Sequence, residues 1–155
     1  MKTVYYDMSD ITAGAVGVFL RDARVMPAGT TLCAAPVQEK QESAYAEFAQ
    51  KDVHFIFTDD MPEIDFYAVP RVDVFARTTD GLLACLGESA DVDSPAPIVL
   101  IDAQRNVRRA AKNLMDMLTS SNWKDGICEE TGVKLYPSRE AAMAEVEFID
   151  IAAKA

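Results

Sequence analysis

The sequence has little of the chemistry that metal sites and catalytic centres use. Its 155 residues contain one histidine, His54, and three cysteines, none of them in a Cys-x-x-Cys pair. A structural zinc site needs four nitrogen or sulfur ligands, and a disulfide framework needs paired cysteines, so neither is expected. His54 stands between Val53 and Phe55 in a short run that is typical of a strand. We therefore expect no metal and no cofactor, and we assign no catalytic residue.

Long apolar runs are also missing. The longest, AGAVGVFL at residues 13–20, falls short of the roughly 20 apolar residues that span a bilayer. The first ten residues, MKTVYYDMSD, lack the basic-then-apolar order of a signal peptide. The sequence therefore predicts a cytoplasmic protein that does not bind membranes. Its length suits a single domain over residues 1–155.

Positive charge is scarce. The chain carries 15 lysines and arginines against 25 acidic residues, which gives a net charge of −10. Residues 41–93 hold twelve acids and only three bases, and so supply −9 of that charge. Such a surface repels phosphate backbones, so nucleic-acid binding is disfavoured. It suits a basic protein partner, although a solvated surface that only keeps the protein soluble is the alternative.

Much of the negative charge falls in two expected loops, residues 58–65 (TDDMPEID) and 87–97 (GESADVDSPAP). Neither has the spacing of an EF-hand, so tight calcium binding is not expected. The residues that we expect to contact a basic partner are Asp59, Asp60, Glu63, Asp65, Asp91 and Asp93. The alternative is a small enzyme or ligand-binding domain, in which paired carboxylates share protons or hold a metal. No histidine or cysteine constellation completes such a site.

A predicted hairpin is the best guide to the fold. Residues 72–77 alternate between two unlike faces, Thr79-Asp80-Gly81 supplies a turn, and residues 82–86 return as the partner strand. Strands are also predicted at residues 1–6, 53–57 and 97–101. Neighbouring strands joined by so tight a turn favour a meander over a β-α-β unit. The sequence therefore predicts an α+β fold with a mainly antiparallel sheet flanked by helices.

Helices are expected at residues 38–50, at 103–119, after Ser9 or Asp10, and from Ser138 to about Ile149. In the second of these, apolar residues recur at helical spacing behind a possible cap, Asp102. Another face carries the basic residues Arg105, Arg108, Arg109 and Lys112. This basic stripe could bind an acidic partner, but we favour pairing with the protein's own acids, because the preceding segment carries −9 of charge.

Four short motifs resemble those of a known family. They are Tyr67-x-x-Pro70-x-Val72-x-Val74-Phe75-Ala76, Asp80-Gly81, Pro97-Ile98-x-x-Ile101-Asp102 and Asn113-Leu114-x-x-x-Leu118. Together they resemble the SUKH superfamily, which includes bacterial immunity proteins and cell-wall glucan-synthesis regulators. The resemblance covers about residues 45–122, whereas residues 1–40 do not align and Ala76-Arg77-Thr78-Thr79 replaces a glycine-rich turn. It implies a mainly antiparallel α+β fold, no enzyme activity, and binding to other proteins, commonly a cognate toxin.

Overall fold

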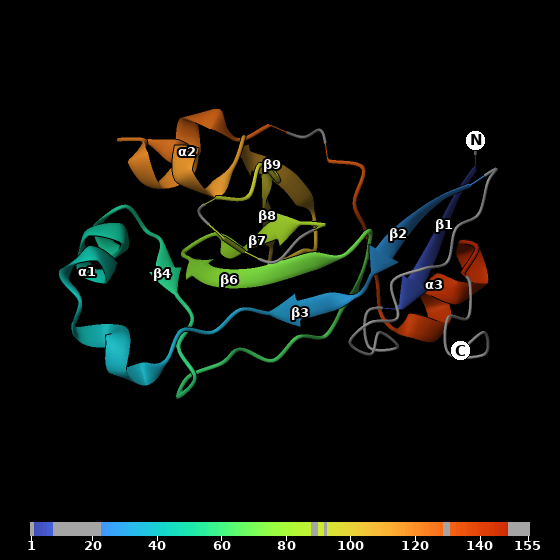
Figure 1. Cartoon of the computed structure of the whole chain (residues 1–155), viewed down its shortest axis with the longest axis horizontal. Helices are drawn as coiled ribbons and strands as arrows, with labels where there is room; N and C mark the ends of the chain where they lie inside the picture. Colours follow the sequence, from blue (N-terminus) through green and yellow to red (C-terminus); the bar gives the residue numbers. More distant parts are fainter. Residues whose placement is uncertain (1, 8–22, 88–89, 92, 129–130, 149–155) are drawn as a thin grey trace.

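A six-stranded sheet forms the centre of the protein (Figure 1). The computed structural model describes residues 2–7, 23–87, 90–91, 93–128 and 131–148. The strand order is β3-β6-β7-β8-β9, and β4 also pairs with β6. The strands are β3 (Thr30–Leu32), β4 (His54–Phe55), β6 (Val72–Thr78), β7 (Gly81–Leu86), β8 (Ile98–Asp102) and β9 (Val107–Ala111). Within this sheet, all pairings except β3 with β6 are antiparallel, which confirms the predicted α+β fold.

The hairpin of β6 and β7 forms where the sequence predicts it. The Thr78 hydroxyl oxygen accepts the backbone N–H of Asp80 at 2.9 Å and that of Gly81 at 3.1 Å. Gly81 has φ +151°, and a Cβ at this position would lie 2.1 Å from the carbonyl oxygen of Ile101. Only glycine fits so close to the neighbouring strand, so the turn chemistry sets the register of the hairpin.

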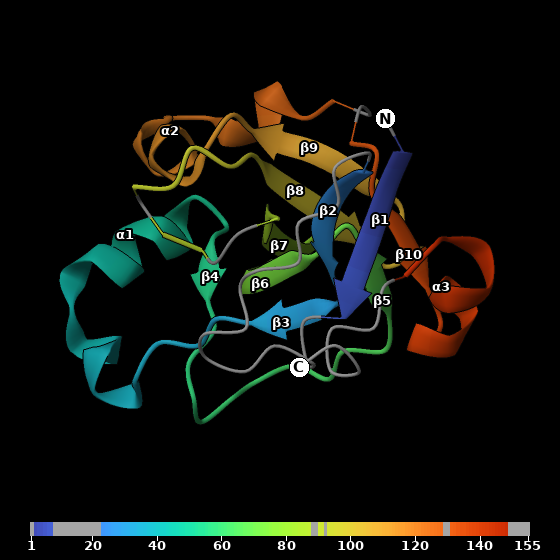
Figure 2. The same cartoon turned by 45° about the vertical axis from the view of Figure 1, so that its right-hand side comes forward.

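Two small sheets and a helix lie beside the central sheet (Figure 2). In one, β1 (Lys2–Asp7) pairs with β2 (Ala23–Ala28) in parallel; in the other, β5 (Tyr67–Val69) pairs with β10 (Lys134–Tyr136). The helix α3 (Arg139–Glu145) begins as predicted, because the Ser138 hydroxyl accepts the N–H of Ala141 at 3.1 Å. The predicted first strand is confirmed. The helix expected after Ser9 or Asp10 lies outside the described residues. The last helix is shorter than predicted, because it ends at Glu145 and Val146 is already extended, with ψ 155°; Ile149 lies outside the described residues.

The central sheet is covered on both faces by apolar side chains. One face carries Phe75, Leu83 and Leu100, and the short helices α2 (Leu114–Thr119) and η3 (Trp123–Gly126) pack there through Leu114, Met117 and Trp123. The other face carries Val72, Val74, Ala84, Val99 and Ile101, with Phe66 packed against them. Neighbouring residues on β7 and β8 thus pack in opposite clusters, as the period of two requires. On β6, Phe75 and Ala76 lie at a bulge and pack in the same cluster. None of the helices in the described ranges is long and apolar enough to cross a membrane.

The predicted helix at residues 103–119 is wrong over most of its length. The Asp102 carboxylate accepts the N–H groups of Gln104 at 3.0 Å and Asn106 at 2.9 Å, and Arg105 has φ +65°. These features make a tight turn, after which the chain returns as β9, antiparallel to β8. The helix begins only after Asn113, whose side-chain oxygen accepts the N–H of Asp116 at 2.7 Å. Pairing with β8 overrides the helical preference of an Arg- and Ala-rich segment.

The segment at residues 37–57 is more broken than predicted. A 3-10 helix, η2 (Val37–Gln41), and the helix α1 (Ser43–Gln50) are separated by Glu42, which is extended with ψ 130°. Tyr45 and Phe48 are half-buried, whereas Ala44 is exposed. The strand predicted at 53–57 pairs with β6 only over His54–Phe55.

Candidate functional site

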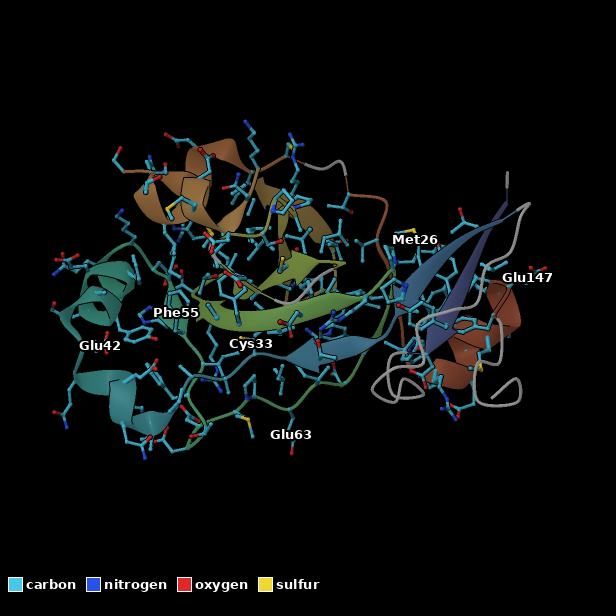
Figure 3. The ribbon with its side chains drawn as sticks, viewed as in Figure 1. Met26, Cys33, Glu42, Phe55, Glu63 and Glu147 are labelled. Carbon is cyan, nitrogen blue, oxygen red and sulfur yellow. The ribbon has the colours of Figure 1, made fainter. Side chains whose placement is uncertain are left out.

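The acidic loop, residues 58–65, is anchored at both ends and exposed in the middle. At its start, Thr58 donates its N–H to the carbonyl of Ala35 at 3.0 Å. At its end, Ile64 and Phe66 pack on the central sheet, and Phe66 is only 8% exposed. Figure 3 shows Glu63 pointing away from the ribbon at the lower edge of the molecule. The loop therefore presents its middle residues to solvent from a fixed base.

Three of its carboxylates form ion pairs with cations from three different elements. Asp59 pairs with Lys40 of η2 at 2.6 Å, and Asp60 pairs with Arg77 of β6 at 3.4 Å. Asp65 pairs with Arg105 of the β8–β9 turn, whose guanidinium also lies 5.0 Å from the centre of the Phe66 ring. The hydrogen bond from Lys40 lowers the pKa of the Asp59 carboxyl. All these charged groups remain accessible to solvent, so the pairs hold the loop in place without burying its charge.

Two side chains in the middle of the loop are left for other contacts. Met61 is 53% exposed, the largest exposed fraction among the large apolar side chains of the described residues. Glu63 is exposed and has no ion-pair partner within the described ranges. Sequence reasoning identified the carboxylates of this loop but missed Met61, because an apolar residue in a loop can equally turn inward, as Ile64 does.

The second acidic segment lies on the opposite side of the central sheet. Ala90 and Ala96 pack on the face that carries Phe75, whereas the acidic loop packs on the face that carries Val74. The Asp91 carboxylate accepts the N–H of Asp93 at 2.9 Å, and both side chains are exposed. The structure therefore brings Asp59, Asp60, Glu63 and Asp65 together in one loop and places Asp91 and Asp93 apart from them.

The paired carboxylates do not converge. Asp59 pairs with Lys40 and Asp60 pairs with Arg77, so their carboxylates bind different cations. The Asp91 carboxylate accepts the backbone N–H of Asp93. In the part of the chain that the structure describes, no group of three or more His, Cys, Asp or Glu residues could hold a metal ion. The geometry therefore offers no specific support for the alternative of a carboxylate-based enzyme or ligand site in the acidic loops.

A polar cluster around Asp52 links three elements that are far apart in sequence. Asp52 follows α1 with φ +64°, and its carboxylate accepts the Thr79 hydroxyl at 2.6 Å and the Lys124 ammonium at 2.7 Å. Partial burial would raise the pKa of Asp52, but these bonds and the Thr79 N–H outweigh it and lower the pKa to about 2. His54 lies 3.2 Å from the same carboxylate and is exposed. The cluster joins α1, the hairpin turn and η3, which is a structural role.

A groove of about 440 Å³ lies where the small sheets meet the central one. It is lined by Thr30, Phe66 and the pair of Asp7 with Arg139, whose atoms are 2.9 Å apart. Asp7 is 4% exposed and also accepts the Tyr67 hydroxyl at 3.0 Å. The sequence holds no signal for this cluster, because its members come from the two ends and the middle of the chain.

No family model, no curated protein and no solved structure matches the chain. The similarity to the SUKH superfamily therefore stays a prediction from short motifs.

Proposed function

We propose that the protein is a non-enzymatic binding domain that holds a basic protein partner through the acidic loop. The observation that carries the proposal is Met61, an exposed apolar side chain in a loop with four carboxylates. Interfaces commonly combine an apolar anchor with a polar rim, and methionine adapts its shape to different partners. The SUKH resemblance favours the same kind of function, in which an immunity or regulatory protein binds a partner such as a toxin.

The charges of the loop suit recognition of a basic surface. Glu63, which has no ion-pair partner among the described residues, can accept a lysine or arginine of the partner. Lys40, Arg77 and Arg105 hold the neighbouring carboxylates in fixed positions. Preorganised side chains lose less conformational entropy when a partner binds. The −9 charge of residues 41–93 would also attract a basic partner over a distance and raise its association rate.

The test begins with capture of partners from a lysate of the native host, followed by rate measurements with the purified partner. Met61→Ala should raise the dissociation rate by roughly tenfold, as loss of an interface anchor does. Neutralising Asp59, Asp60, Glu63 and Asp65 together should slow association by about one to two decades at low salt, and rising salt should slow the wild type similarly. Folding should be nearly intact, because exposed ion pairs contribute little to stability.

A matched control separates this surface from general effects of exposed residues. Met143 in α3 is 42% exposed and Glu47 in α1 is exposed, so Met143→Ala with Glu47→Gln makes similar changes away from the loop. This control should bind as the wild type does. A partner whose rates respond neither to salt nor to the loop substitutions would show that the acidic loop is only solvated surface.

A further inference from the structure

Within the described residues, three cations of this acidic protein lack the partners that most of the others have. Ion pairs with the protein's own carboxylates are formed by Lys40, Arg77, Arg105, Lys124, Lys134 and Arg139. Arg108, Arg109 and Lys112 have neither an ion pair nor a side-chain hydrogen bond in the part of the chain that the structure describes, and all three are exposed. In a chain with 25 acids and 15 bases, such unpaired cations are available to an external anion.

Two of these cations, Arg109 and Lys112, line the same pocket. It measures about 180 Å³ and lies between β9, α2 and η3, of which β9 and α2 are side by side in Figure 2. Ser120 and Asn122 also line it, and Met117 and Trp123 form its apolar wall. The Ser120 oxygen accepts the N–H of Asn122, which leaves its hydroxyl proton to donate, and one Asn122 amide proton is used by Asp125. The pocket therefore offers cations and neutral donors together.

A β-bulge lies in β9 directly after Arg109, among the residues that line the pocket. The pairing passes from Val99 with Arg109 to Ile98 with Ala111, so Ala110 is an extra residue in the strand. Bulges redirect side chains at the edges of sheets. Here the successive residues Ala110 and Ala111 both pack against the same core cluster, which departs from strict alternation between Arg109 and Lys112.

We propose that this pocket binds the phosphate group of a small molecule. A guanidinium can bind a phosphate through two parallel hydrogen bonds, and an ammonium adds a point charge. A phosphate has more acceptor oxygens than a carboxylate, and so can use the hydroxyl and amide donors as well. The volume is below the roughly 300–1,000 Å³ of pockets for drug-sized ligands, so it suits a compact anionic group. Asp116 also lines the pocket and weakens the binding of any anion there.

The chain contains one tryptophan, Trp123, and it lines the pocket. Its fluorescence can therefore report binding in the pocket. Sodium phosphate titrated at pH 7, with sodium chloride keeping the ionic strength constant, should change the Trp123 fluorescence in a saturable way. Arg109→Gln and Lys112→Gln should each weaken binding by about tenfold, the effect of losing one charged hydrogen bond. Asp116→Asn should strengthen it several-fold, because it removes the repelling charge. Glycerol 3-phosphate in place of inorganic phosphate shows which source of the group binds more tightly, and saturable binding of either supports the site.

Arg108→Gln is the matched control, because it removes the same charge from the neighbouring position of β9 and does not line the pocket. It should leave the affinity within about twofold of the wild type, as expected for screened surface charges. Equal weakening by Arg108→Gln would overturn the site in favour of general charge attraction. An equal response to sodium acetate, or no saturable response to either phosphate, would overturn the phosphate assignment. Circular dichroism checks folding, and if Arg109→Gln does not fold, Lys112→Gln and Asp116→Asn decide the result.

Discussion

Asp52 shows how one side chain can hold distant parts of the chain together. It occupies the left-handed position after α1, where glycine or asparagine is usual. Its carboxylate accepts bonds from Thr79 and Lys124, and is only 17% exposed. We infer that these bonds offset the energetic cost of a left-handed aspartate. They do so because a partly buried carboxylate is stabilised when it accepts hydrogen bonds and pairs with a cation.

Asp52→Asn tests this role, since asparagine tolerates the left-handed conformation but carries no charge. At pH 7 the substitution should lower the free energy of unfolding by about 1–2 kcal/mol. A larger loss is not expected, because Lys124 is partly exposed and solvent screens its ion pair with Asp52. The folded pKa of about 2 lies below the ordinary value of 3.8, so this stabilisation is fully present above about pH 4. It is lost as the pH falls towards 2. Urea titrations at pH 7 and pH 2.5 should therefore show a difference that shrinks in acid, with Asp93→Asn near wild type at both. A deficit equal at both pH values would contradict the charge-based explanation.

At the scale of elements, strands and turns with strong local signals could be predicted from the sequence. The β6–β7 hairpin has both an alternating pattern and a turn glycine, and β8 is a short apolar run, so these elements are confirmed. The strand β9 could not be predicted, because its Arg- and Ala-rich residues favour a helix locally and only pairing with β8 selects the strand. The same limit applies to the candidate site. The acidic loop was predictable from its composition, but its ion pairs depend on Lys40, Arg77 and Arg105, which only the tertiary fold brings near.

The short helix α2 should be held by its buried face alone. Leu114 is 4% exposed in the core, whereas its neighbour Met115 is 47% exposed. Leu114→Ala should lower the free energy of unfolding by about 2–5 kcal/mol, the usual cost of emptying a buried leucine site. Met115→Ala should change it by less than about 0.5 kcal/mol, as expected for a surface position. Guanidinium titrations of both variants compare the two faces directly, and equal effects would mean that the faces of α2 are assigned wrongly.

For the whole molecule, the question is whether the small sheets and the central sheet unfold together. The chain passes from β2 to β3 through Gly29 and from β5 to β6 through Pro70. Gly29 donates its N–H to Ala68 at 2.7 Å, and its carbonyl accepts the N–H of Val72 at 3.1 Å. The Thr30 hydroxyl adds a bond to the carbonyl of Phe66 at 3.0 Å. These bonds cross the junction between the sheets, so we expect the two parts to behave as one cooperative unit.

Val4→Ala tests this cooperativity, because Val4 is fully buried in β1 while Trp123 reports on the far face of the central sheet. The substitution should lower the free energy of unfolding by about 1–2 kcal/mol, the cost of removing buried methyl groups. If the molecule unfolds as one unit, the midpoints measured by Trp123 fluorescence and by far-UV circular dichroism should coincide and fall by the same amount. Val37→Ala, at a valine 39% exposed, should leave both midpoints unchanged. An unchanged fluorescence midpoint beside a two-step circular dichroism curve would show that the small sheets unfold on their own, because only the part that contains Val4 would then have lost stability.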